Sequence, residues 1–268
     1  MSFPLARLGR DLADLITPVA CAGCGRSDIA LCDSCAAELF SPLRRVDADA
    51  RYLAGLLPTW AACSYPRVRS IVLAYKNHTR RDIATTIRAA ARSAGDQFMG
   101  AASAESHVAY HLADHLHRGG ALVLVPAPSG RARRWRRRLV AAELADALAH
   151  GIAEAAAIRI GRPARIATAD ILRKPLAAEV SGHLAGLNSM DRAAARRHAV
   201  TVVAPLRPDD VVLLVDDVVT TGATLAASYR ALKAARIRVA GAIALAATPA
   251  SSNGLAGERS SKRKADYT

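Results

Sequence analysis

An uninterrupted apolar run, VVLLV at residues 211–215, is the clearest hydrophobic pattern of the chain. It follows a Pro-Asp-Asp turn, and such a run predicts a strand that is covered on both faces, as in a parallel sheet. The apolar spacing of Leu225, Tyr229 and Leu232 then predicts a helix that opens near Thr224. The two patterns together predict a strand, a short turn and a helix.

The same patterns recur along the chain. Strands are predicted within residues 51–65, at 121–125, around Ile166, at 200–204 and at 238–246, and helices at 4–16, within 68–94, at 107–116 and from Val140 through Leu148. Strands that alternate with helices indicate an α/β fold, with a parallel sheet flanked by helices. Ligands of such a sheet bind at the carboxyl ends of its strands.

Polar residues that can bind a phosphorylated sugar follow the 211–215 strand directly. Two carboxylates come first, then a small, hydroxyl-rich turn: Asp216, Asp217, Thr220, Thr221, Gly222, Ala223 and Thr224. Free backbone N–H groups of the turn and of the first helical turn form a concavity suited to a phosphate. The carboxylates can accept hydrogen bonds from a sugar diol or hold a hydrated divalent cation. A Walker B strand is the alternative, but the chain contains no G-x-x-x-x-G-K-[ST] loop to accompany it.

This pattern resembles the loop that binds 5-phosphoribosyl 1-diphosphate (PRPP) in type I phosphoribosyltransferases. The resemblance implies that Asp216 and Asp217 contact the ribose hydroxyls and that residues 220–224 surround the 5-phosphate. We expect Gly222→Val to block the phosphate and to preserve the fold, because these side chains should face the cleft.

A second candidate loop follows the predicted strand at 121–125. The sequence Pro-Ala-Pro continues as Ser129, Gly130 and Arg131, which offers exposed N–H groups beside a cation and suits a pyrophosphate. Five more arginines lie between positions 133 and 138 around Trp135. They could bind pyrophosphate or a nucleic-acid backbone, or they could be a solvated helix start.

Four cysteines near the amino terminus have the spacing of a metal site. Cys21, Cys24, Cys32 and Cys35 form two CxxC pairs that can supply four thiolates to a structural Zn²⁺. Glycines 23 and 25 fit a tight knuckle turn. A redox CxxC is the alternative. Cys63 lies in a predicted strand and is expected to be a core residue.

The order of these motifs resembles the ComF/GntX-like phosphoribosyltransferases, the competence-protein-F family. The resemblance covers about residues 18–248 and implies roles for Lys76, with Arg131, Asp216 and Asp217, as catalytic residues. Ser129 and Gly130 would join the 216–224 loop in binding PRPP. The chain departs from the family pattern at Arg137, Leu139, Leu184 and Ala195.

Two functions follow from this resemblance. The first is a Mg²⁺-dependent enzyme that transfers ribose 5-phosphate to an unknown acceptor in nucleotide metabolism or DNA uptake. The second is a non-catalytic PRPP- or nucleotide-binding accessory protein of competence or DNA processing, with single-stranded DNA or the uptake machinery as partners.

Length and charge complete the sequence-based prediction. The 268 residues carry a formal net charge of +14, which favours anionic ligands. No apolar stretch is long enough for a membrane span, and charged residues interrupt the apolar start, so we expect a cytoplasmic protein. We predict an amphipathic helix (1–17), a zinc-binding module (18–45), a phosphoribosyltransferase-like domain (46–248) and a disordered basic tail (249–268). The sequence does not indicate an oligomeric state.

Overall fold

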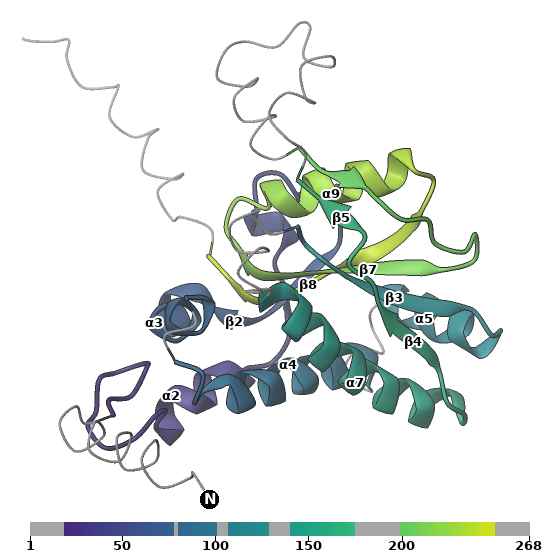
Figure 1. The fold of residues 1–268 in the computed structure, drawn as a ribbon. Helices are drawn as coiled ribbons and strands as arrows, with labels where there is room; N and C mark the ends of the chain where they lie inside the picture. Colours follow the sequence, from purple (N-terminus) through teal and green to yellow (C-terminus); the bar gives the residue numbers. More distant parts are fainter. Residues whose placement is uncertain (1–18, 78–79, 101–106, 129–139, 175–198, 250–268) are drawn as a thin grey trace, which may run out of the picture.

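A six-stranded sheet with strand order β1-β2-β8-β7-β3-β4 organises the chain (Figure 1). This computed structural model describes residues 19–77, 80–100, 107–128, 140–174 and 199–249. The strands are β1 (Arg44–Arg45), β2 (Thr59–Ser64), β3 (Ala121–Pro126), β4 (Arg165–Thr168), β7 (Val211–Val219) and β8 (Arg238–Ala247). Only β1 pairs antiparallel to its neighbour, and the other pairs of this sheet are parallel. The predicted α/β fold with a largely parallel sheet is confirmed.

Helices cover both faces of the sheet. One face packs against α3 (Tyr65–Lys76), α4 (Ala84–Met99), α5 (His107–His117) and α7 (Val140–Ile160). The other face packs against α9 (Ala223–Ala234) and the segment 46–57, which contains the short helix η2 (Asp47–Asp49). Figure 1 shows α9 on one side of the strands and α4 and α7 on the other. The short helices α2 (Asp33–Ala37) and η1 (Glu38–Phe40) follow the cysteine pairs.

The apolar run of β7 serves both faces, as predicted. Leu213 and Val215 belong to the core on the α4/α7 side, whereas Val212 and Leu214 belong to the core on the α9 side, and all four are fully buried. An uninterrupted apolar sequence is therefore needed, because successive side chains of a strand point to opposite faces.

Several predicted elements differ in extent. The interval 51–65 contains one strand, β2, and the interval 68–94 holds parts of two helices, α3 and α4. The predicted strand at 200–204 is shorter, β6 (Thr201–Val202), and pairs with β5 (Leu172–Arg173) in a separate two-stranded sheet. Its residues alternate between exposed and partly exposed positions, so this mostly apolar segment is not covered on both faces as a central strand is. The predicted helix at 4–16 lies outside the described residues.

Candidate functional site

The two aspartates lie within β7, and not after it as predicted. Pairing between β3 and β7 ends at Pro126 and Val215, whereas pairing between β7 and β8 continues to Val219. Past this point, the backbone N–H of Ala127 still donates to the Val215 carbonyl oxygen, at 2.7 Å. Asp216 and Asp217 therefore lie beyond the paired part of β3, while β8 still pairs with this part of β7.

The last turn of α3 places Lys76 beside these aspartates. Its Nζ forms an ion pair with Oδ2 of Asp217. The side chains are 24% and 12% exposed, so the pair is largely shielded from solvent and is stronger than a surface pair. The other carboxylate oxygen of Asp217, Oδ1, accepts the backbone N–H of Val218 at 2.9 Å. Three of the predicted catalytic residues, Lys76, Asp216 and Asp217, thus lie together.

The surroundings of Asp216 disfavour the ionised form of its carboxyl group. Loss of solvation on burial and the nearby charge of Asp217 together raise its pKa to about 8, and the backbone N–H of Asp217 and the Lys76 ammonium offset only part of this effect. Its Oδ1 accepts the backbone N–H of Asp217 at 2.8 Å. A carboxyl group held in this way favours a cation or a hydroxyl donor as its ligand, since either would stabilise the ionised form.

The segment 46–57 packs against the turn that follows β7. Gly222 has φ 76°, and a Cβ at this position would come within 2.4 Å of the Leu53 side chain, which is fully buried. The backbone N–H of Tyr52 donates to the Thr221 carbonyl oxygen at 3.0 Å. The expectation that Gly222→Val preserves the fold is therefore wrong, because Gly222 faces the core and has the left-handed backbone conformation that favours glycine.

The rest of the turn faces outward. Thr220 and Thr221 are exposed, and Thr224 is partly exposed. Thr221 Oγ1 accepts the N–H of Ala223 at 3.4 Å, and Gly222 caps α9 without a side-chain hydrogen bond. The first-turn N–H groups of α9 and the threonine hydroxyls are thus placed where an anion could accept their hydrogen bonds.

Tyr75, next to Lys76, ties α3 to α7, a link that the sequence analysis did not predict. Its hydroxyl donates to Oε2 of Glu143 at 2.5 Å, and its side chain is 3% exposed. Burial, followed by this hydrogen bond and the charge of Glu143, raises the pKa of Tyr75 above its usual range. This hydrogen bond holds the end of α3 against α7, and it therefore helps to position Lys76 at Asp217. No sequence spacing indicates it, because the two residues lie in separate helices.

Some predicted site residues lie outside the described part of the chain. These are Ser129, Gly130 and Arg131, together with Arg137, Leu139, Leu184 and Ala195. Arg173 of β5 forms an ion pair with Asp170 at 2.8 Å.

The four predicted metal ligands converge. The Sγ atoms of Cys21, Cys24, Cys32 and Cys35 all lie within 4.8 Å of one another. Two of the Sγ–Sγ distances, from Cys32 to Cys21 and to Cys24, are 3.7 Å. Tetrahedral Zn²⁺ with Zn–S bonds of about 2.3 Å requires sulfur separations near this value. The four-thiolate set fits a structural zinc and leaves no position for water.

The backbone around the cysteines is shaped as a knuckle. The N–H of Cys32 points to Sγ of Cys21 at 3.4 Å, and Gly25 has φ 79°. A Cβ on Gly23 would lie 2.6 Å from Sγ of Cys35, so only glycine fits there. Cys63, in contrast, is 1% exposed in the core, as predicted.

Arg80 fastens the cysteine module to the α/β core. Its Nη1 donates to the Ala20 carbonyl oxygen at 2.5 Å, its Nη2 donates to that of Ala30 at 3.0 Å, and Asp82 pairs with its guanidinium at 2.7 Å. Ile71 of α3 approaches Gly23 from the core side. The module therefore packs directly on the helix that carries Lys76.

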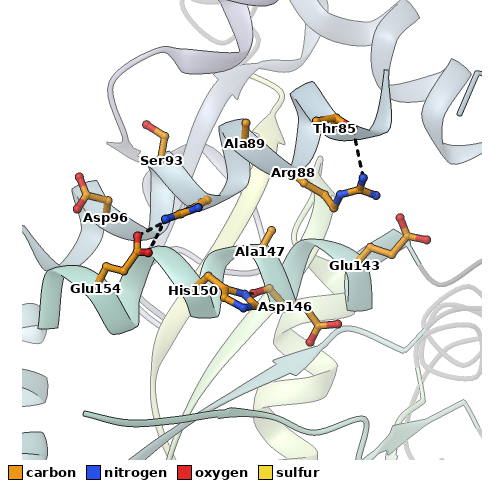
Figure 2. A pocket seen from close by; sticks show the side chains of 11 residues that line it. Thr85, Arg88, Ala89, Ser93, Asp96, Glu143, Asp146, Ala147, His150 and Glu154 are labelled. Carbon is orange, nitrogen blue, oxygen red and sulfur yellow. Dashed lines mark hydrogen bonds and ion pairs between the residues drawn. The ribbon is translucent and has the colours of Figure 1, made fainter. Parts of the chain in front are cut away.

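A groove of about 710 Å³ lies elsewhere, between α4 and α7 (Figure 2). All the residues that line it come from these two helices, and an ion pair between Arg92 and Glu154 crosses it. Its wall mixes acidic and basic side chains without a converging set of ligands.

The comparison with family models finds one match, to the part of the chain that contains the turn. The model of the phosphoribosyl transferase domain matches residues 174–254, which include β7, the turn and α9. The matched segment, which is less than half of the chain, is thus similar to a phosphoribosyl transferase domain. A search of the curated proteins found no match to this chain. No described helix has the length and apolar character needed to cross a membrane.

Proposed function

We propose that this protein binds PRPP with Mg²⁺ at the carboxyl end of β7 and transfers its ribose 5-phosphate group to an acceptor. The observation that carries the proposal is the meeting of Lys76 with Asp217, next to Asp216 and the 220–224 turn. An anion-binding turn, two carboxylates and a cation are the groups that a phosphorylated, pyrophosphate-bearing ribose requires.

Each group has a role in this reaction. The amides and hydroxyls of the 220–224 turn hold the 5-phosphate, and Asp216 and Asp217 accept hydrogen bonds from the ribose hydroxyls. Mg²⁺, when bound, neutralises pyrophosphate oxygens. The bond from ribose C1 to the pyrophosphate oxygen breaks, the acceptor nucleophile forms the new bond to C1, and its proton leaves to solvent. Lys76 and Arg131 would stabilise the charge on the departing pyrophosphate.

The particular family, the domain bounds and the cellular location are also proposals. The motif order supports a ComF/GntX-like member with a zinc module at 18–45 and a transferase-like domain at 46–248, acting in the cytoplasm. Departures from that family's pattern at Arg137, Leu139, Leu184 and Ala195 favour a second candidate, a PRPP-binding accessory of DNA uptake or processing without turnover.

Calorimetric titration tests the proposal. The full chain should bind PRPP only when Mg²⁺ is present, and Asp217→Asn should weaken this binding at least about tenfold, because the amide loses the charge that attracts the cation. Inorganic phosphate, which contacts only the 220–224 turn, should bind the variant as it binds the wild type. Asp96→Asn, an exposed carboxylate on α4, is the matched control.

The outcomes separate the two candidates. Pyrophosphate release with one member of a panel of nucleobases supports the enzyme, whereas PRPP binding without release across the panel supports the accessory protein. Absence of Mg²⁺-dependent PRPP binding at millimolar ligand contradicts both.

A further inference from the structure

Four arginines gather at the amino-terminal edge of the sheet, the edge opposite the aspartates. They line a cavity of about 440 Å³ and are Arg118, Arg165, Arg207 and Arg238. The sheet register brings them together, because parallel strands begin at one edge: Ala121 of β3 pairs with Arg165 of β4, and Val211 of β7 pairs with Arg238 of β8. Arg118 follows α5, and Arg207 precedes β7.

Three of these guanidinium groups have no carboxylate partner within the described ranges. Arg165 Nη1 donates to the carbonyl oxygen of Gly119 at 3.1 Å, and Arg238 Nη2 donates to that of Asp209 at 2.8 Å. Both acceptors are neutral, so they orient the arginines without cancelling their charge. The Arg207 side chain makes no hydrogen bond or ion pair in the described part of the chain.

The remaining charges only partly offset this excess. Arg118 forms an ion pair with Asp114 at 2.8 Å. Asp209 and Asp210 also line the cavity, and Oδ2 of Asp210 accepts the backbone N–H of Arg207 at 3.1 Å. Guanidinium forks without carboxylate partners recognise phosphate oxygens bidentately, so the cavity favours an anion with several phosphate groups.

A second cavity, of about 300 Å³, adjoins the first and shares His115 and Arg238 with it. Its wall is formed mainly by apolar side chains and by His107, His111 and His115, which recur every four residues on one face of α5. In the described ranges, the one group of three or more side chains with converging metal-ligand atoms is the cysteine set, so the three imidazoles do not converge on a common point.

The His115 ring is fixed between the two cavities. Its Nε2 lies 3.3 Å from the Ala121 carbonyl oxygen. A Cβ on Gly120 would lie 2.1 Å from the ring, so the glycine permits this close contact. The imidazole thus lies where the basic cavity meets the apolar one.

We propose that these two cavities form a second site, for a nucleoside di- or triphosphate. The phosphates occupy the arginine cavity, and the base lies against the imidazoles. Both volumes are compact and adjacent, as a small ligand with one charged and one planar part requires. A nucleic-acid strand would instead need an extended basic track with stacking aromatic residues.

Calorimetry of the full chain with ATP and, separately, with inorganic triphosphate tests this site. Wild type should bind ATP more tightly than triphosphate. Arg207→Gln and Arg165→Gln should each weaken ATP about tenfold, since each removes a charge-assisted hydrogen bond. His111→Ala should weaken ATP and leave triphosphate unchanged. Arg230→Gln, an exposed arginine of α9, is the charge-matched control and should bind as wild type.

Other outcomes overturn the proposal. They are absence of ATP binding at millimolar ligand, unchanged affinity in both arginine variants, an equal loss in Arg230→Gln, and equal affinity for ATP and triphosphate. Displacement of ATP by a single-stranded oligonucleotide, sensitive to Arg207→Gln, would assign the surface to nucleic acid instead. Asp217→Asn should leave ATP binding unchanged, so failure of this site and failure of the PRPP site are distinguishable.

Discussion

Asp216 is held at the site against its own electrostatic preference. Its pKa is raised to about 8 by burial and by the neighbouring Asp217, well above the value near 4 of an aspartate in an unfolded chain. Between these two values the native protein binds a proton that the unfolded chain has lost. The free energy of unfolding therefore falls as pH rises from about 4 to 8.

Asp216→Asn should remove this loss. The variant should match the wild type near pH 4 and exceed it at pH 8 by up to about 5 kcal/mol in free energy of unfolding, since each pKa unit corresponds to about 1.4 kcal/mol. Urea unfolding of both proteins at several pH values measures the difference. The same variant should bind Mg²⁺ and PRPP more weakly, because the amide lacks the negative charge that attracts the cation. An Asn variant less stable than the wild type at pH 8 would show that the carboxylate is well accommodated.

Gly222 should be required for packing as well as for the turn. Gly222→Ala places a methyl group against Leu53 and retains a φ of 76°, so we expect a loss of roughly 2–3 kcal/mol in free energy of unfolding. Leu53→Ala in the same chain should recover the steric part, which a double-mutant cycle by urea unfolding measures. Additive losses would place the problem outside the Gly222–Leu53 contact.

At the scale of elements, helices and strands with strong local patterns could be predicted from the sequence. The distant segments that pack against them could not. The apolar run and the turn residues predicted β7 and α9 to within a few positions. Nothing in the sequence indicates that residues 46–57 lie under the turn, because that contact joins distant segments through Tyr52 and Leu53. Likewise Gly95 and Gly151 let α4 and α7 approach closely, where a Cβ would meet backbone oxygens of the other helix. Alanine-rich helices alone do not show which of their glycines make such a contact.

The cysteine module should depend on its metal. Purified protein should carry one zinc per chain, and Cys24→Ser should release it and lower the thermal midpoint, because an incomplete thiolate set binds zinc weakly. Metal analysis and thermal unfolding check both expectations. Cys63→Ser lies outside the four-cysteine set and should retain the zinc, which makes it the control. Metal-free protein with an unchanged midpoint would leave a redox role for the pairs.

At the scale of the whole molecule, α3 joins the two sites. Its Ile71 faces the cysteine module, Tyr75 bonds to α7, and Lys76 pairs with Asp217. The sequence predicted the two ends of this connection separately, the cysteines from their spacing and Lys76 from a family resemblance. The sequence could not predict that one helix contacts both sites, because contacts with distant segments leave no repeating pattern in the helix sequence.

This arrangement predicts that zinc affects PRPP binding without touching it. Arg80→Gln should loosen the module, because it removes the donors to the Ala20 and Ala30 carbonyl oxygens, and removal of zinc should do the same from the other side. A looser module leaves the α3 end less constrained, so Lys76 is held less firmly at Asp217. We expect Mg²⁺-dependent PRPP binding to weaken about three- to tenfold in calorimetry, a coupling of order 1 kcal/mol.

Hydrogen exchange of the peptide 65–77 supplies a readout that does not depend on PRPP. Exchange should rise in zinc-free protein and in Arg80→Gln, and it should stay at the wild-type rate in Arg69→Gln, whose exposed side chain on α3 has no partner among the described residues. Faster exchange with unchanged PRPP affinity would mean that α3 anchors the module but does not position Lys76. Unchanged exchange in zinc-free protein would show that the two sites are not coupled. The cysteine module would then stabilise only its own loop.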